Sequence, residues 1–118
     1  MFRVREKAFI ASVAAFVLKG DKVAIVIGST IYLNGTKEME LLKSTTWLRH
    51  ELMHVQQYRQ YGTFLFGIKY LWESFRKGYR NNRYEIEARK METVFDFEKK
   101  FEVVSRKEEQ IKRTTNHQ

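Results

Sequence analysis

The stretch WLRHELMHVQQY, residues 47–58, contains two of the three histidines of the chain, four positions apart, with Glu51 directly after the first. Side chains at positions i and i+4 are neighbours on a helix, so a helix here places His50 beside His54. Two interpretations of this pair are open. Either both imidazoles bind one metal ion, or they lie on a buried helix face and hydrogen-bond to core groups while Glu51 pairs with an Arg or Lys.

A helix over residues 44–62 is predicted around these histidines. Its N-terminus can be capped by one of three hydroxyl residues, Ser44, Thr45 or Thr46. Its C-terminus can be ended by Gly62. Three apolar residues continue the side that carries the histidines: Leu48, Leu52 and Val55. The histidines are therefore expected to point toward the protein interior.

The complete chain predicts an α+β fold, mainly α, with four helices and one small β-hairpin. There is no proline in the chain, which favours helices because the strongest helix breaker is missing. The helices are expected at residues 3–19, 44–62, 63–77 and 83–112. The hairpin is expected from Val23–Ile27 and Thr30–Leu33, joined by a two-residue turn at Gly28 and Ser29. The connections are residues 36–43, as a loop or one helical turn, and the turn at residues 79–83.

Two of the predicted helices carry apolar stripes at helical spacing. In the third helix the stripe consists of Phe64, Ile68, Leu71 and Phe75. Aromatic residues at such spacing belong more often to a core than to a binding surface. In the fourth helix the stripe continues over Phe95–Val104, which suggests a homo-oligomer or a protein partner that binds through this C-terminal helix.

Length and composition are typical of one globular domain. The chain has 118 residues, 43% hydrophobic and 31% charged, so one domain over residues 1–118 is expected, with residues 113–118 as a frayed tail. The uncharged run Ala8–Leu18 is similar to part of a secretory signal. Glu6 is out of place in such a signal, and no small-x-small cleavage site follows the run. Its eleven residues are too few to cross a bilayer, so we expect a cytoplasmic protein without a transmembrane segment.

The histidine pair is suited to a zinc ion. The chain contains no cysteine, so any metal must be held by His, Asp or Glu. On one helix, His50 and His54 can reach one ion at about 2.0–2.1 Å. Glu51 lies one position off their line, where it can take a proton from a water that the metal activates. A catalytic zinc ion needs a third protein ligand, and a carboxylate from another helix is the natural donor.

The segment NRYEIEARK, residues 82–90, supplies such a carboxylate. Glu85 lies in the first turn of the fourth helix, and Ala88, one turn later, is small enough for close approach of the two helices. Glu87 points elsewhere and is the poorer candidate. Structural roles are also open for Glu85, as the capping-box partner of Asn82 or the i,i+4 ion-pair partner of Arg89.

RHELMHVQQY followed by NNRYEIEAR resembles the gluzincin class of zinc metallopeptidases, in particular its minimal bacterial members. The resemblance implies a zincin-like domain with one Zn²⁺ per chain, held by His50, His54 and Glu85. It also implies that Glu51 is the general base and that the substrate is a peptide or protein whose peptide bonds are hydrolysed. This sequence departs from the family at Arg89. Many relatives have an aspartate at this position, and that aspartate orients a ligand histidine.

Several points stay open at the level of sequence. Three residues are alternatives for support of the oxyanion: Tyr79, Arg80 and Tyr84. A peptide substrate can add alongside Thr30–Leu33 if that strand lies at an exposed edge. The alternative, that Tyr32 of this strand is a packing residue, is the favoured one. Alternatively, the protein binds zinc without catalysis.

A different class of function is suggested by the net charge of +8. A basic helical module would bind nucleic acid or an anionic membrane surface. Its basic residues are Arg76, Lys77, Arg80 and Arg83. Its interleaved aromatic residues are Tyr70, Trp72, Phe75 and Tyr79. No nucleic-acid-binding motif accompanies them, so no specific nucleic acid is expected.

Overall fold

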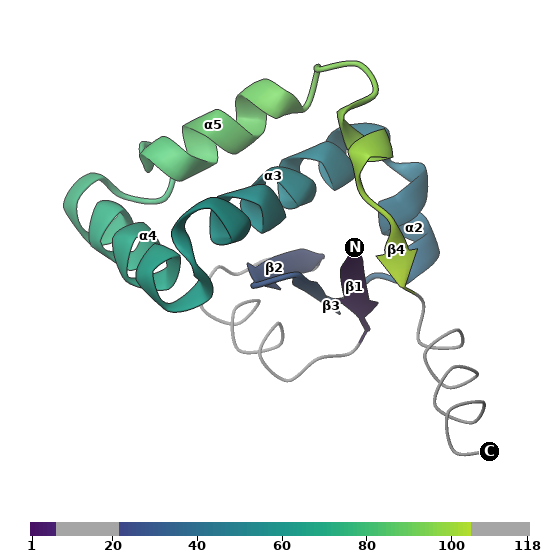
Figure 1. Ribbon diagram of the computed structural model, residues 1–118, viewed down its shortest axis with the longest axis horizontal. Helices are drawn as coiled ribbons and strands as arrows, with labels where there is room; N and C mark the ends of the chain where they lie inside the picture. The colour runs from purple at the N-terminus through teal and green to yellow at the C-terminus, as the bar shows by residue number, and fades with distance from the viewer. Residues whose placement is uncertain (7–21, 105–118) are drawn as a thin grey trace.

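The computed structural model describes residues 1–6 and 22–104. It arranges them as a small four-stranded sheet with helices gathered over one side (Figure 1). The described helices are α2 (Glu38–Lys43), α3 (Thr45–Tyr61), α4 (Thr63–Lys77) and α5 (Arg83–Met91), followed by a short 3₁₀ helix, η1 (Phe97–Lys100). The expected α+β fold, mainly α, is confirmed. No helix in these two ranges is long and apolar enough to cross a membrane.

The sheet contains the predicted hairpin at one edge. Strands β2 (Val23–Ile27) and β3 (Thr30–Asn34) pair antiparallel, with Ile27 opposite Thr30, so the turn has two residues as expected. Gly28 begins this turn with φ at 64°, a conformation that favours glycine. Two further strands complete the order β2-β3-β1-β4: β1 (Phe2–Arg5) and β4 (Val103–Val104). β3 is therefore an inner strand, so the condition for a substrate to add alongside it, an exposed edge, is not met.

The helix predicted over residues 3–19 is wrong at its start, where β1 forms instead. Phe2 and Val4 are buried while Arg3 is exposed, which is the alternation of a half-buried strand. β1 pairs parallel to β3, with Val4 beside Ile31. Burial of these two apolar side chains against the sheet outweighs the local helix propensity. The rest of that predicted helix, residues 7–21, lies outside the described residues.

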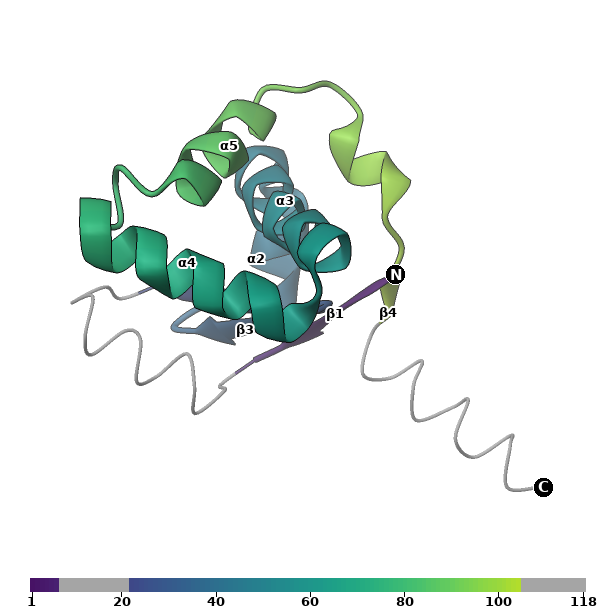
Figure 2. The same ribbon diagram turned by 60° about the vertical axis from the view of Figure 1, so that its left-hand side comes forward.

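Helix α3 lies between the sheet and α5, and α4 packs beside α3 (Figures 1 and 2). The prediction of a helix over residues 44–62 is confirmed. Leu48, Leu52 and Val55 are buried as expected and join the core above the sheet. Before α3, the chain forms the six-residue helix α2 where a loop or a single turn was expected.

The long helix predicted over residues 83–112 is wrong over residues 92–104, because α5 ends at Met91. Asp96 has φ at 64°, which is incompatible with a continuing helix. Phe97 is 1% exposed and packs against Phe101, and the chain then pairs with β1 as β4. Residues 95–104 therefore form no single helical face: Phe97 is buried in the core, Val103 and Val104 form a strand, and Phe95 is 81% exposed. Residues 105–118, including the expected tail, lie outside the described residues.

Helix α4 has the predicted bounds but not the expected orientation. Phe64 and Phe75, in the stripe assigned to the core, are 82% and 85% exposed. Phe66, outside that stripe, is 1% exposed and packs against Tyr58 and Tyr84. The helix thus turns its most apolar side outward.

Candidate metal centre

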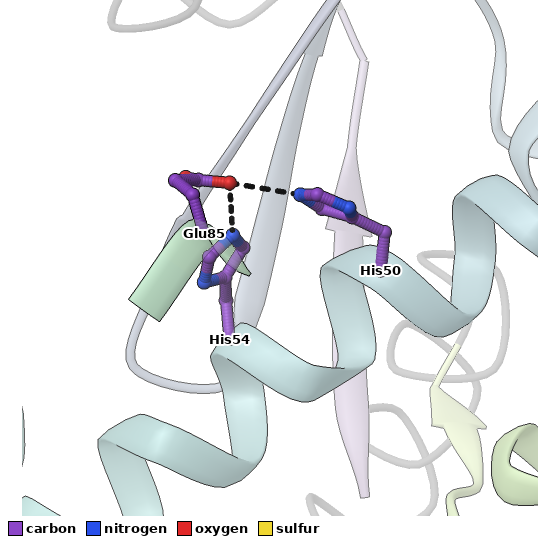
Figure 3. Close-up of side chains that lie close together, drawn as sticks. All are labelled: His50, His54 and Glu85. Atoms are coloured by element: carbon purple, nitrogen blue, oxygen red, sulfur yellow. Dashed lines mark hydrogen bonds and ion pairs between the residues drawn. The ribbon is translucent and has the colours of Figure 1, made fainter. Parts of the chain in front are cut away.

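Three predicted site residues converge on one point between α3 and α5. The Nε2 atom of His50 lies 2.9 Å from Oε1 of Glu85, and Nε2 of His54 lies 3.1 Å from the same oxygen (Figure 3). The three ligand atoms lie within 4.8 Å of one another, and the group could hold a metal ion. All three side chains are largely shielded from solvent, at 13%, 9% and 3% exposed.

The start of α5 explains why Glu85 reaches the histidines. Asn82 is fully buried and caps α5, its side-chain oxygen accepting from the backbone N–H of Tyr84 at 2.8 Å. Its amide nitrogen donates to the Tyr70 carbonyl on α4 at 3.0 Å, which fixes the cap between the helices. Ala88 is fully buried, as a close helix contact requires.

The structural roles considered for Glu85 are met only in part. Asn82 does cap α5, but the carboxylate of Glu85 points to the imidazoles. Its second oxygen accepts a hydrogen bond from the hydroxyl of Tyr70. Arg89 donates to the carbonyl of Arg80, and within residues 1–6 and 22–104 it forms no ion pair with Glu85.

The outer nitrogen of each imidazole has its own partner. Nδ1 of His50 donates to the carboxylate of Glu92 at 2.8 Å, and Nδ1 of His54 donates to the amide oxygen of Gln57 at 2.9 Å. Such bonds fix the ring orientation and direct Nε2 toward a shared ligand point. Glu92 and Gln57 thus orient the histidines, whereas Arg89 stands at the position where the resemblance would place an orienting aspartate.

Gln57 and Glu92 were not found by reasoning from the sequence. Gln57 is fully buried, and its amide nitrogen also donates to the Tyr84 carbonyl at 3.0 Å and to Glu87 at 3.1 Å. Its position three residues after His54 on the same helix was an available signal. Glu92 follows Glu85 by seven residues, two helical turns later on the same side.

The cluster strongly perturbs proton binding. Burial alone would lower the pKa of His50, but the hydrogen bond to Glu85, the charge of Glu51 and the hydrogen bond to Glu92 outweigh it and raise that pKa to about 9. Burial would also lower the pKa of His54, but the hydrogen bond to Glu85 and the charge of Glu51 outweigh burial, so this pKa is raised. For Glu85, burial is outweighed by the hydrogen bonds from both histidines, which hold its pKa well below its usual range. Without a metal, the imidazoles thus retain protons that a metal must displace.

Glu51 lies beside the histidines at a cleft. The cleft has a volume of about 340 Å³ and is lined by Ser44, Thr46, Trp47, His50, Glu51, Tyr79 and Glu92. Burial raises the pKa of Glu51 to about 6, although the nearby histidines oppose the rise. In the described part of the chain no Arg or Lys forms an ion pair with Glu51. Arg49, the nearest in sequence, pairs with Glu98 at 2.8 Å.

Of the three alternatives for the oxyanion, only Tyr79 lines this cleft. Burial raises its pKa, as do the charges of Glu85 and Glu51, so its hydroxyl stays protonated at neutral pH. Tyr84 is 6% exposed and lies against Phe66, with ring centroids 5.0 Å apart. The imidazole of His50, the carboxylate of Glu51 and the phenol of Tyr79 therefore line an open cleft, and His54 and Glu85 lie behind it against His50.

Comparison with known protein families gives a match in the N-terminal part of the chain. Residues 5–62 match the family model of the eCIS core domain, a domain related to extracellular contractile injection systems. The matched part contains His50, Glu51 and His54, and it ends before Glu85. No curated protein and no solved structure matches the chain.

Proposed function

We propose that the protein is a small zinc-dependent metallopeptidase. The observation that supports this most strongly is the approach of one Glu85 oxygen to Nε2 of both His50 and His54, at 2.9 and 3.1 Å. Two histidines and one glutamate are the protein ligands of a well-known type of catalytic zinc site. A buried carboxylate that meets two imidazoles from another helix is the arrangement that the gluzincin resemblance implies.

The ligand spacing fits Zn²⁺. Bonds of about 2.0–2.1 Å in a tetrahedron place neighbouring ligand atoms about 3.3 Å apart. The two separations from Glu85 are shorter than this by a few tenths of an ångström, and all three ligand atoms lie within 4.8 Å of one another. When bound, Zn²⁺ polarises the scissile carbonyl and lowers the pKa of a water molecule. The cleft at His50 and Glu51 leaves room for that water and a substrate.

Glu51 would act as the general base and then as the general acid. It lies beside the ligands without being one of them, and its pKa of about 6 is close to neutral pH. A base with such a pKa can accept a proton from the attacking water and return it to the leaving amine. Tyr79, protonated and in the same cleft, would donate a hydrogen bond to the carbonyl oxygen as negative charge develops there.

The function is tested by comparing the wild type with Glu51→Gln on a broad peptide library. The variant removes the base and leaves the proposed ligands intact, so we expect retained zinc and lost hydrolysis. Glu102→Gln is a matched control, because it changes an exposed glutamate in the same way. Equal cleavage by wild type and Glu51→Gln would contradict the peptidase proposal. Zinc binding without cleavage by any of the three proteins would support the non-catalytic alternative.

The match to the eCIS core domain supports a proposal about partners. We propose that the chain works with a protein complex of the extracellular contractile injection type. Tagged full-length protein should then co-purify with components of such a system from cells that make it. Recovery of the tagged protein alone from those cells would contradict this partner.

A further inference from the structure

Helix α4 presents a continuous apolar surface to solvent. Its members share one side of the helix and are at least half exposed: Phe64, Leu65, Ile68, Leu71, Trp72 and Phe75. We call this set the α4 face. Phe66, on the opposite side of the helix, is 1% exposed and anchors α4 to the body of the protein. A contiguous exposed apolar patch of this kind is typical of an interaction site.

The charges around the α4 face are positive. Within α4, the basic residues are Lys69, Arg76 and Lys77; the turn that follows adds Arg80, and α5 begins with Arg83. Glu73 is the single acidic residue of the helix. Glu73 is 8% exposed. Its carboxylate accepts a hydrogen bond from the backbone N–H of Arg83 at 3.2 Å and forms an ion pair with Lys77 at 3.8 Å. The solvent-facing side therefore combines aromatic and aliphatic residues with cations.

We propose that the α4 face docks on a bilayer surface that contains anionic lipid. A helix with Trp, Phe and Leu on one side and Lys and Arg beside them lies in the interface between headgroups and acyl chains. Trp72 and Phe75 would enter this boundary, and Arg76, at the edge of the α4 face, would contact anionic headgroups. Docking needs no unfolding, because Phe66 and Tyr70 on the inner side keep their contacts with α3 and α5.

The chemistry of the α4 face favours lipid over two other occupants. A second copy of the chain would bring the basic rims together at a net charge of +8 per chain, which opposes association. Nucleic acid would satisfy the cations and stack on aromatic rings. It would leave the aliphatic side chains of Leu65, Ile68 and Leu71 exposed to water.

The test uses the full chain with phosphatidylcholine vesicles and with vesicles of phosphatidylcholine and phosphatidylserine in equal parts. Trp47 and Trp72 are the only two tryptophans, so the Trp47→Phe variant makes Trp72 the only fluorescent reporter. We expect co-sedimentation with the anionic vesicles, a blue shift of Trp72 emission and weaker binding as salt is added. No co-sedimentation and no shift would overturn the proposal.

Matched variants separate the apolar and the charged contributions. Phe75→Ser should weaken vesicle binding about tenfold or more, whereas Phe95→Ser, which removes a ring that is 81% exposed elsewhere, should not. Arg76→Gln should weaken it about fivefold, and Lys43→Gln on α2 should have little effect. Leu71→Ser provides a second test of the face if Phe75→Ser is poorly folded.

Two results would assign the α4 face to another occupant and overturn the proposal. One is concentration-dependent dimerisation that Phe75→Ser abolishes, with no vesicle binding. The other is binding to single-stranded or duplex DNA that Phe75→Ser abolishes, with no vesicle binding.

Discussion

His54 donates through Nδ1 to the amide oxygen of Gln57 at 2.9 Å, and the amide nitrogen of Gln57 donates to the Tyr84 carbonyl at 3.0 Å. One buried side chain therefore connects the orientation of an imidazole on α3 to the start of α5. Glu85, the carboxylate that meets both imidazoles, comes directly after Tyr84. The geometry of the centre thus depends on the packing of the two helices.

Replacing Gln57 should weaken zinc binding and the fold together. In Gln57→Leu, His54 loses its orienting partner, and zinc affinity should fall about 10- to 100-fold. The Tyr84 carbonyl also loses its donor, which should lower the free energy of unfolding by about 1–3 kcal/mol. Titration against a competing chelator and thermal unfolding measure the two effects. Gln60→Leu, at an exposed position of the same helix, should change neither.

Tyr79→Phe should reduce kcat about 100-fold or more while zinc content stays unchanged, because one donor to the developing oxyanion is lost. Steady-state kinetics on a cleaved peptide and metal analysis of the same samples test this. Tyr84→Phe removes a hydroxyl at the alternative residue and should leave kcat near the wild-type value. The opposite pattern would assign the role to Tyr84.

Metal-free and zinc-bound protein should respond to pH in opposite directions. The pKa of His50 is raised from 6.5 to about 9 in the metal-free fold, so its protonated form stabilises this state fully below pH 6.5. That stabilisation is lost as the pH rises to about 9. Zinc needs a neutral imidazole, so its affinity should increase across the same window.

Thermal unfolding with and without a chelator tests this dependence. Relative to His50→Gln, the metal-free wild type should lose Tm as the pH rises through this window. The increase in Tm caused by added zinc should grow over the same range. A zinc effect that is independent of pH would contradict protonation of His50 in the metal-free state.

The orientation of α4 predicts unequal effects for two phenylalanines. Phe66→Ala should lower the free energy of unfolding by about 3–5 kcal/mol, because it leaves a cavity among buried aromatic rings. Phe75→Ala, at a side chain that is 85% exposed, should change it by less than about 0.5 kcal/mol. Chemical denaturation of both variants measures the difference. Equal losses would mean that the outer stripe is also packed in solution.

Much of the fold follows from local patterns in the sequence. The hairpin turn at Gly28, the end of α3 at Gly62 and the end of α4 at Gly78 were all predictable, because glycine marks positions where φ is positive. The pairing of β1 with β3 and β4 was not, since it joins segments far apart in the chain. The alternation of Phe2 and Val4 with arginines was a short signal that a helical interpretation obscured.

The candidate site was predictable in its ligands but not in their support. His50, His54 and Glu85 stand in a recognisable pattern, and the structure brings them together. Gln57 and Glu92 have no such pattern, and their roles depend on how α5 packs on α3. The outward orientation of the α4 stripe was also hidden, because periodicity identifies a helix face without showing what covers it.

The central claim is that His50, His54 and Glu85 together hold one zinc ion, and the zinc content of purified protein tests it most directly. Elemental analysis should find about one zinc per chain in the wild type and in Glu102→Gln, which changes an exposed glutamate outside the ligand set. His50→Ala and Glu85→Gln should lose the metal while remaining folded by circular dichroism. Equal zinc content in all four proteins, or none in the wild type after dialysis against zinc, would contradict the claim.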